Sequence, residues 1–170
     1  MSLDFFVQSE IAENFKRISE IRKSGIFNKE NIEHPLFKSA LIEAIICLRD
    51  LMYKCEEYAS RIFFVEDIII TDNIKDITDL ITFVRDALCH IHSHKHKFGT
   101  NIFTYNIVIG KNPNAYSING ISRGCDYEDD MCFLFGEQKI YMLRHIGRVY
   151  DEAKKLLIPL LDKQFKILLD

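Results

Sequence analysis

Apolar positions in the N-terminal third of the chain recur at the three- and four-residue steps of amphipathic α-helices. Over residues 4–24 this spacing predicts a first helix, and Gly25 suits its C-terminal end. Pro35 is well placed for the first turn of a second helix. The apolar stripe of that helix alternates four- and three-residue steps, which is typical of a bundle seam. The stripe consists of Phe37, Leu41, Ala44, Leu48, Leu51, Cys55, Tyr58 and Ile62.

Two further helices are predicted later in the chain. One runs from about Ile74 to His92 or slightly beyond, with Asp72 or Asn73 as its capping residue. The other begins near Leu143, and Pro159 should kink or interrupt it. The core stripe expected for the third helix is Ile77, Leu80, Ile81, Val84, Leu88 and Ile91.

The hydrophobic period changes between these two helices. The segment NIFTYNIVIG (101–110) alternates and is β-rich, whereas KNPNAYSING (111–120) is predicted to be a loop. MCFLFGEQKIYM (131–142) is typical of a hairpin with Gly136 and Glu137 at the turn. The sequence therefore predicts a mainly α protein, a helical bundle in one domain over 1–170. A small β-hairpin insertion at about 101–142 precedes its last helix.

Composition narrows the class of protein only slightly. The chain has 170 residues and a net charge of −3, so no global basic field indicates nucleic acid, although a local cationic cleft is compatible with it. No secretory signal or membrane-spanning stretch is recognised, so a cytoplasmic protein without a membrane partner is expected. The cysteines are odd in number and lack CxxC spacing, which predicts reduced thiols at Cys47, Cys55, Cys89, Cys125 and Cys132.

The segment FVRDALCHIHSH (83–94) carries the candidate chemistry. On a helical wheel Asp86 lies roughly 180° and His90 roughly 220° from Ile77, so both point away from the core. Phe83 lies at roughly 240°, on the same outward face, with the small residue Ala87 beside it. A phenylalanine opposite the core stripe predicts a second buried surface, and the simplest interpretation is a partner subunit.

Asp86 and His90 form a pair four residues apart in the favourable order, so the carboxylate should stabilise the imidazolium. Arg85 adds a permanent cation whose planar fork suits phosphate. This set suits cleavage of RNA, where the 2′-OH is an internal nucleophile and no metal is required. The reaction needs both a base and an acid, and a two-fold dimer through the Phe83 face would bring two copies of His90 together.

The segment RDALCH (85–90) is an arginine, four residues and a histidine, with a polar residue after the arginine, near the end of a predicted helix. In this it resembles the HEPN superfamily (higher eukaryotes and prokaryotes nucleotide-binding domain). The resemblance implies an up-and-down bundle of four or five helices, a homodimer with both motifs at the interface, and metal-independent endoribonuclease activity leaving cyclic-phosphate ends. It also implies that Arg85 binds phosphate, Asp86 is the polar orienting residue and His90 is the catalytic histidine.

The family also suggests a biological setting. Its members act as toxins in toxin–antitoxin pairs, in abortive infection and as nuclease domains of CRISPR effectors. RNA, a second copy of the chain, and an antitoxin or other defence-system partner are therefore the partners that the resemblance implies, and no cofactor is expected.

Other interpretations of these residues remain open. Arg85, Asp86 and His90 could be an ordinary ion pair on a solvated helix face, or the remnant of a HEPN-like dimer that binds nucleotides or proteins without cutting RNA. The alternating histidines of HIHSHKH could hold zinc, since His90 and His94 lie one helical turn apart. We favour a cationic rim that contacts a phosphate backbone, formed by His92, His94, Lys95, His96 and Lys97.

Two further polar segments lie in and after the β insertion. The acidic run CDYEDD (125–130) lacks the glycine and ligand spacing of a calcium loop, so a solvated acidic edge is predicted. Arg144, His145 and Arg148 either extend an RNA-binding surface or lie on the solvated face of the last helix.

Overall fold

The computed structural model describes residues 3–90, 92–118 and 120–169. It divides into two compact units. The terminal unit comprises Met1–Ile62 and Val149–Asp170, and the central unit comprises Phe63–Arg148.

Strands are far more extensive than the sequence pattern predicted. The chain is 52% helical and 19% strand, with the strands in three small antiparallel sheets. The protein is therefore an α+β mixture, and the prediction of a mainly α, up-and-down four- or five-helix bundle with one hairpin is wrong. The strands lie within residues 97–141, close to the predicted insertion.

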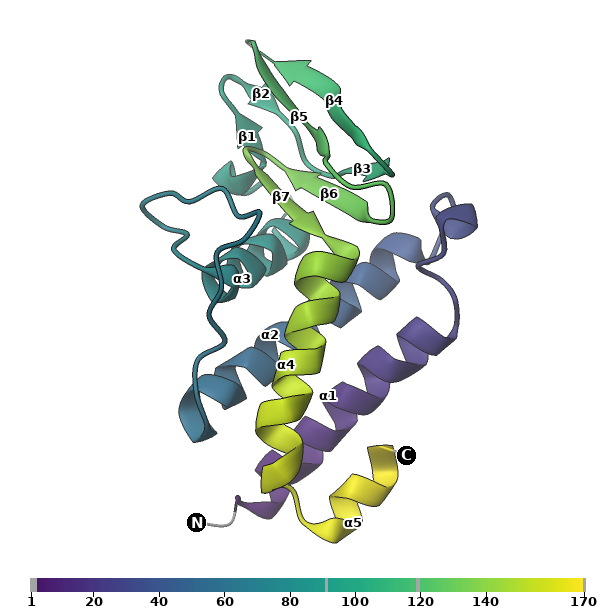
Figure 1. Cartoon of the computed structure of the whole chain (residues 1–170), viewed down its shortest axis with the longest axis vertical. Coiled ribbons are helices and arrows are strands. Elements are labelled where there is room, and N and C mark those ends of the chain that lie inside the picture. The colour runs from purple at the N-terminus through teal and green to yellow at the C-terminus, as the bar shows by residue number, and fades with distance from the viewer. Residues whose placement is uncertain (1–2, 91, 119, 170) are drawn as a thin grey trace. The chain divides into compact units, whose positions relative to one another are not determined.

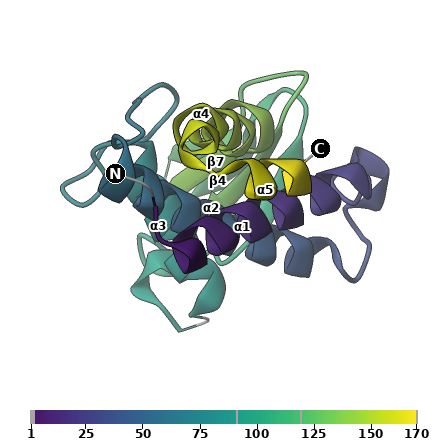
Figure 2. The same cartoon turned by 90° about the horizontal axis from the view of Figure 1, so that it is seen from below.

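The terminal unit is helical. It contains α1 (Phe5–Lys23), α2 (Phe37–Tyr58), most of α4 (Arg148–Leu157) and the short α5 (Lys163–Lys166), which lies beside α1 (Figures 1 and 2). Asp4 caps α1 by accepting a hydrogen bond from the Phe6 amide at 2.9 Å. The predicted stripes of α1 and α2 supply much of the buried core, including Ile11, Ile18, Leu41, Leu48 and Leu51.

Several contacts attach the C-terminal segment of the terminal unit to α1, among them a ring pair and a buried glutamine. The Tyr150 ring packs edge-on against Phe15, with ring centroids 5.7 Å apart. The Gln8 side chain is buried and binds Asp162 twice, donating from Nε2 to Oδ2 and accepting from the Asp162 amide. Pro159 lies in a 3₁₀ turn (Ile158–Leu160) directly after α4, so the predicted interruption of the last helix is present.

The central unit combines α3 (Ile77–Cys89) with the sheets (Figure 1). A three-stranded sheet has the order β3 (Asn106–Ile109), β6 (Met131–Phe135) and β7 (Gln138–Tyr141), and every residue of β6 is buried. Two-stranded ribbons pair β1 (Lys97–Phe98) with β2 (Asn101–Ile102) and β4 (Asn112–Ile118) with β5 (Ile121–Cys125). A π-helical turn, η3 (Met142–Gly147), joins β7 to α4.

One predicted hairpin is present, and one predicted loop is a strand. β6 and β7 pair antiparallel, with Gly136 and Glu137 at the turn, as the sequence indicated. The sequence predicts a loop over 111–120. Instead, most of it forms β4, whose register with β5 shifts between Asn112 and Tyr116. Pro113 lies in this irregular part of a two-stranded ribbon, where a missing amide hydrogen is tolerated.

The third helix is shorter than predicted at both ends. Asp76, rather than Asp72 or Asn73, is its N-cap, and its side chain accepts from the Asp79 amide at 3.0 Å. The helix ends at Cys89, because His90 has an extended backbone (φ −123°, ψ 91°). Among the described helices, none combines the length and apolarity needed to cross a membrane.

Candidate functional site

His90 lies at the C-cap of α3, so it is not on the helix face that the wheel assigned to it. The His90 amide still donates to the Asp86 carbonyl at 3.0 Å, which completes the last turn. The chain then folds back: the Ser93 amide donates to the His90 carbonyl at 3.0 Å, and the His96 ring nitrogen Nε2 donates to the same oxygen at 3.1 Å. These bonds hold the loop after α3 in a compact turn.

Asp86 is the centre of a small charge cluster. Its Oδ1 contacts Arg85 at 3.0 Å and its Oδ2 contacts the Lys95 ammonium at 2.5 Å. Burial raises the pKa of the Asp86 carboxyl, but the hydrogen bond from Lys95 and the charges of Lys95, Arg85 and His90 outweigh it, so this pKa is lowered. Asp86 is therefore ionised at neutral pH, where it fixes the position of both cations.

A cavity of about 610 Å³ opens beside this cluster. We call it the histidine cavity; its lining residues are Asp86, Cys89, His90, His92, Ser93 and Lys95. The side chains of His90 and His92 are exposed, so their imidazoles are accessible to a ligand. The structure therefore brings two histidines, an ammonium and an ionised carboxylate of one chain to one opening.

A second cavity of about 680 Å³ shares Lys95 with the first. We call it the phenylalanine cavity; it is lined by Thr71, Asn73, Asp79, Thr82, Phe83, His94, Lys95, Lys97, Glu137 and Gln138. The predicted substrate-binding residues are thus divided: His92 lies on the first cavity, His94 and Lys97 on the second, and Lys95 on both. His96, which the sequence assigned to the same rim, is buried.

The two predicted dimer residues lie in different environments. Phe83 is half-buried, lines the phenylalanine cavity, and has the Lys95 ammonium 5.3 Å from its ring centroid. Ala87 is only 2% exposed, so its side chain is not accessible to a partner. The predicted homodimer stays a prediction, but Phe83 and Ala87 do not form one open face.

The histidine run does not assemble a metal site within the described residues. Among them, no group of three or more His, Cys, Asp or Glu side chains is arranged to hold a metal ion. The five cysteines are free thiols, and of these Cys89 is exposed while the other four are buried.

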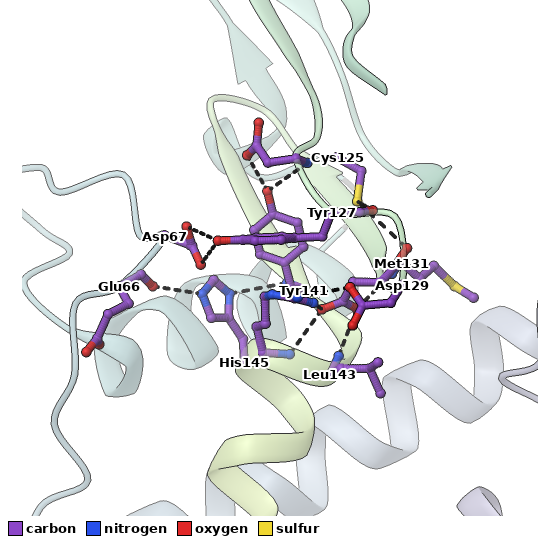
Figure 3. Close-up of polar contacts among 12 residues, drawn as sticks. Glu66, Asp67, Cys125, Tyr127, Asp129, Met131, Tyr141, Leu143 and His145 are labelled. Carbon is purple, nitrogen blue, oxygen red and sulfur yellow. Dashed lines mark hydrogen bonds and ion pairs between the residues drawn. The ribbon is translucent and has the colours of Figure 1, made fainter. Parts of the chain in front are cut away.

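A second polar cluster lies where β7 enters η3, and Figure 3 shows its contacts. Asp130 is buried, and its Oδ1 accepts from the amides of Met131 (2.7 Å) and Leu143 (2.9 Å). Its Oδ2 accepts from the Arg144 amide (3.1 Å) and the Arg144 guanidinium (3.0 Å). The acidic run 125–130, predicted to be a solvated edge, therefore ends in a buried carboxylate. Both of its oxygens accept hydrogen bonds, which connect the β5–β6 loop to η3.

His145 is part of the same cluster and is 1% exposed. Its Nδ1 accepts from the Tyr141 amide at 3.2 Å, and its Nε2 donates to the Glu66 carbonyl at 3.0 Å (Figure 3). Nearby, the Tyr127 hydroxyl contacts both carboxylate oxygens of Asp67, at 2.8 and 2.7 Å. His145 is therefore a neutral structural histidine that joins segments of the central unit, and it is not available to RNA.

The stability of the protein should fall as the pH is lowered from about 7 to about 5, partly because of His145. Burial lowers the pKa of His145, against the opposing effects of its bond to Glu66 and of Asp67 and Asp130. The unfolded chain binds a proton near the ordinary histidine pKa of about 6.5, whereas the folded chain binds it only at lower pH. Between these values the unfolded state holds more protons, so acid favours unfolding.

Urea unfolding of the wild type and His145→Asn at several pH values measures this contribution. The asparagine oxygen can still accept from the Tyr141 amide but does not titrate. We expect the variant to be less stable at pH 7, with a smaller loss on acidification; one proton corresponds to at most about 1.4 kcal/mol per pH unit. If the free energy of unfolding falls with pH at the same slope in both proteins, His145 does not contribute to the acid sensitivity.

In comparisons with protein-family models, curated proteins and solved structures, no match to the chain is found. The HEPN resemblance therefore stays a prediction that rests on the RDALCH segment. Of the residues that the sequence singled out, Asp86 and His90 line the histidine cavity, and Arg85 contacts Asp86. Sequence reasoning missed the ion pair between Asp86 and Lys95, which are nine residues apart and meet only because the chain turns back after α3.

Proposed function

We propose that the chain is a metal-independent endoribonuclease whose reaction site is the histidine cavity. The proposal rests on one observation. His90, His92 and Lys95 line one cavity, beside the Arg85–Asp86 ion pair. Imidazoles supply acid and base near neutral pH, and arginine and lysine stabilise phosphate charge. The HEPN resemblance supports the same reaction and suggests a bacterial defence or toxin-like setting with an antitoxin-type partner.

The reaction needs only groups of the substrate and of these side chains. The 2′-oxygen of one nucleotide attacks the adjacent phosphorus, a P–O2′ bond forms and the P–O5′ bond breaks. A base takes the 2′-OH proton and an acid protonates the departing 5′-oxygen, which leaves a 2′,3′-cyclic phosphate and a 5′-OH. We assign acid–base work to His90 and phosphate contacts to Arg85 and Lys95, while Asp86 is a positioning residue for both cations.

The second proton-transfer group has two candidate sources. His92 lies on the same cavity as His90, so one chain contains two accessible imidazoles. A homodimer, as the HEPN resemblance implies, would instead supply a second copy of His90. Sedimentation together with activity across a concentration series separates them: a His92-dependent enzyme keeps its specific activity as a monomer, whereas a composite site loses it on dilution.

The test is cleavage of single-stranded and structured RNA in EDTA by the wild type, His90→Ala and Arg85→Ala, with product ends identified. We expect the wild type to leave cyclic-phosphate ends, and each variant to lose about 100-fold or more in rate. His34→Ala is the matched control, because His34 is an exposed histidine in the terminal unit. Absence of cleavage by folded wild-type protein, in both monomeric and dimeric preparations, would overturn the proposal in favour of a non-catalytic nucleotide- or protein-binding module.

A further inference from the structure

We infer that the phenylalanine cavity is a subsite for one unpaired nucleobase, so that the enzyme cuts single-stranded RNA next to the nucleotide held there. The inference rests on the proposed function, because it names the class of RNA that the histidine cavity receives. Lys95 lines both cavities, so a nucleotide whose base occupies one cavity can place its phosphate at the other.

The size and walls of the cavity suit a base. Its volume of about 680 Å³ lies within the usual range for small-molecule sites. Phe83 supplies an aromatic ring for stacking, and Lys95 beside that ring supplies a cation for the adjoining phosphate. The lining contains both acidic and basic side chains. It also contains neutral polar groups from Thr71, Asn73 and Thr82.

Gln138 provides an independent indication of a ligand. Its side chain is 3% exposed and lines the cavity, and its Oε1 is buried without a hydrogen-bond partner among the described residues. Buried acceptors are normally satisfied, and a small rotation of this side chain toward the cavity would let a ligand donor satisfy Oε1. Every nucleobase carries an N–H donor on its Watson–Crick edge, and that edge is free only when the nucleotide is unpaired.

The position of Gln138 is fixed by the fold. It is the first residue of β7, paired with Phe135 across the hairpin turn. Phe83, which also lines the cavity, lies within α3, two residues before Arg85. The aromatic ring and the amide therefore come from a helix and a strand of the same unit, which gives the subsite rigid walls.

Binding is measured first, because it does not depend on turnover. The four nucleoside 3′-monophosphates and ribose 5-phosphate are titrated into the wild type, Phe83→Leu and Gln138→Leu by calorimetry. We expect the wild type to bind nucleotides more tightly than the sugar phosphate, and each variant to bind nucleotides about tenfold more weakly with sugar-phosphate binding unchanged. Gln138→Leu should fold normally, because it replaces a buried amide whose oxygen has no hydrogen-bond partner by an apolar side chain of similar size.

Cleavage then separates the two proposals. If wild type cuts single-stranded RNA at least tenfold faster than a duplex of the same sequence, and both variants lose that preference, the subsite is supported. Nucleotides that bind no better than ribose 5-phosphate, or variants that bind them like wild type, would overturn the subsite even if RNA is cut. Base-dependent binding without any cleavage would support the subsite and count against the nuclease.

Discussion

Asp130→Ala is expected to destabilise the protein by about 3–5 kcal/mol, because it removes a buried carboxylate that is the hydrogen-bond acceptor for three backbone amides. The Asp130 side chain is fully buried and accepts from three backbone amides as well as from the Arg144 guanidinium. Alanine leaves the Met131 amide at the start of β6, and the amides of Leu143 and Arg144 at the start of η3, without this acceptor. Urea unfolding followed by circular dichroism gives the free energy of unfolding of both proteins.

Asp129→Ala is the matched control for that experiment. Asp129 also binds Arg144, at 2.9 Å, but its side chain is 69% exposed. Exposed ion pairs contribute little, so we expect a change of less than about 0.5 kcal/mol. If both variants lose the same free energy of unfolding, the burial of Asp130 does not cause its effect. The cluster in Figure 3 then does not hold η3 in place.

These neighbouring aspartates show what the sequence pattern could not distinguish. The run CDYEDD is acidic throughout, and nothing in its composition marks Asp130 as buried and Asp129 as exposed. The signal lies 13 residues away, in the amides at the start of η3, and becomes visible only when β6 and β7 have paired. The burial of His145 could not be predicted for the same reason, because its hydrogen-bond partner Glu66 is remote in sequence.

Local patterns predicted the helices better than the sheets. The stripes of α1 and α2 depend on residues three and four apart, and most of their core positions are buried in the structure. The exceptions in α2 are Tyr58, which is exposed, and Ile62, which is buried but lies beyond the end of the helix. β4 was missed because its strand pattern is interrupted by Pro113 and an irregular register. Since β4 lies in a ribbon outside the three-stranded sheet, none of its residues is buried, so the strand carries little alternation for a pattern to detect.

The candidate site was predicted in part for the same physical reason. The sequence paired Asp86 with His90 on one helix face, whereas in the structure Asp86 contacts Arg85 and Lys95. The helix was extended past His90 because the apolar period continued to Ile91, which lies outside the described residues. The actual end at Cys89 turns the chain back and brings Lys95 to Asp86. The position of Lys95 in turn depends on the β6–β7 hairpin, through Gly136.

Gly136→Ala is expected to lower both stability and RNA cleavage. Gly136 has a φ of +54°, and a methyl group there would lie 2.5 Å from the Lys95 carbonyl and 2.6 Å from the Lys97 carbonyl. Alanine strains the backbone by about 1–2 kcal/mol. Displacing the backbone of residues 95–97 adds roughly 1–3 kcal/mol. Because Lys95 lines both cavities, its displacement should also slow cleavage at fixed substrate concentration.

Gly120→Ala is the control that separates backbone strain from displacement of residues 95–97. Gly120 has a similar φ of +77°, but a methyl group there would meet no atom within 4 Å. It should therefore show the backbone strain alone, with cleavage like that of wild type. Both variants are compared at a temperature where each is fully folded, so that a rate difference reports the site. Gly136→Ala could instead have the same free energy of unfolding as Gly120→Ala and cut RNA at the wild-type rate. In that case the β6–β7 hairpin does not position Lys95.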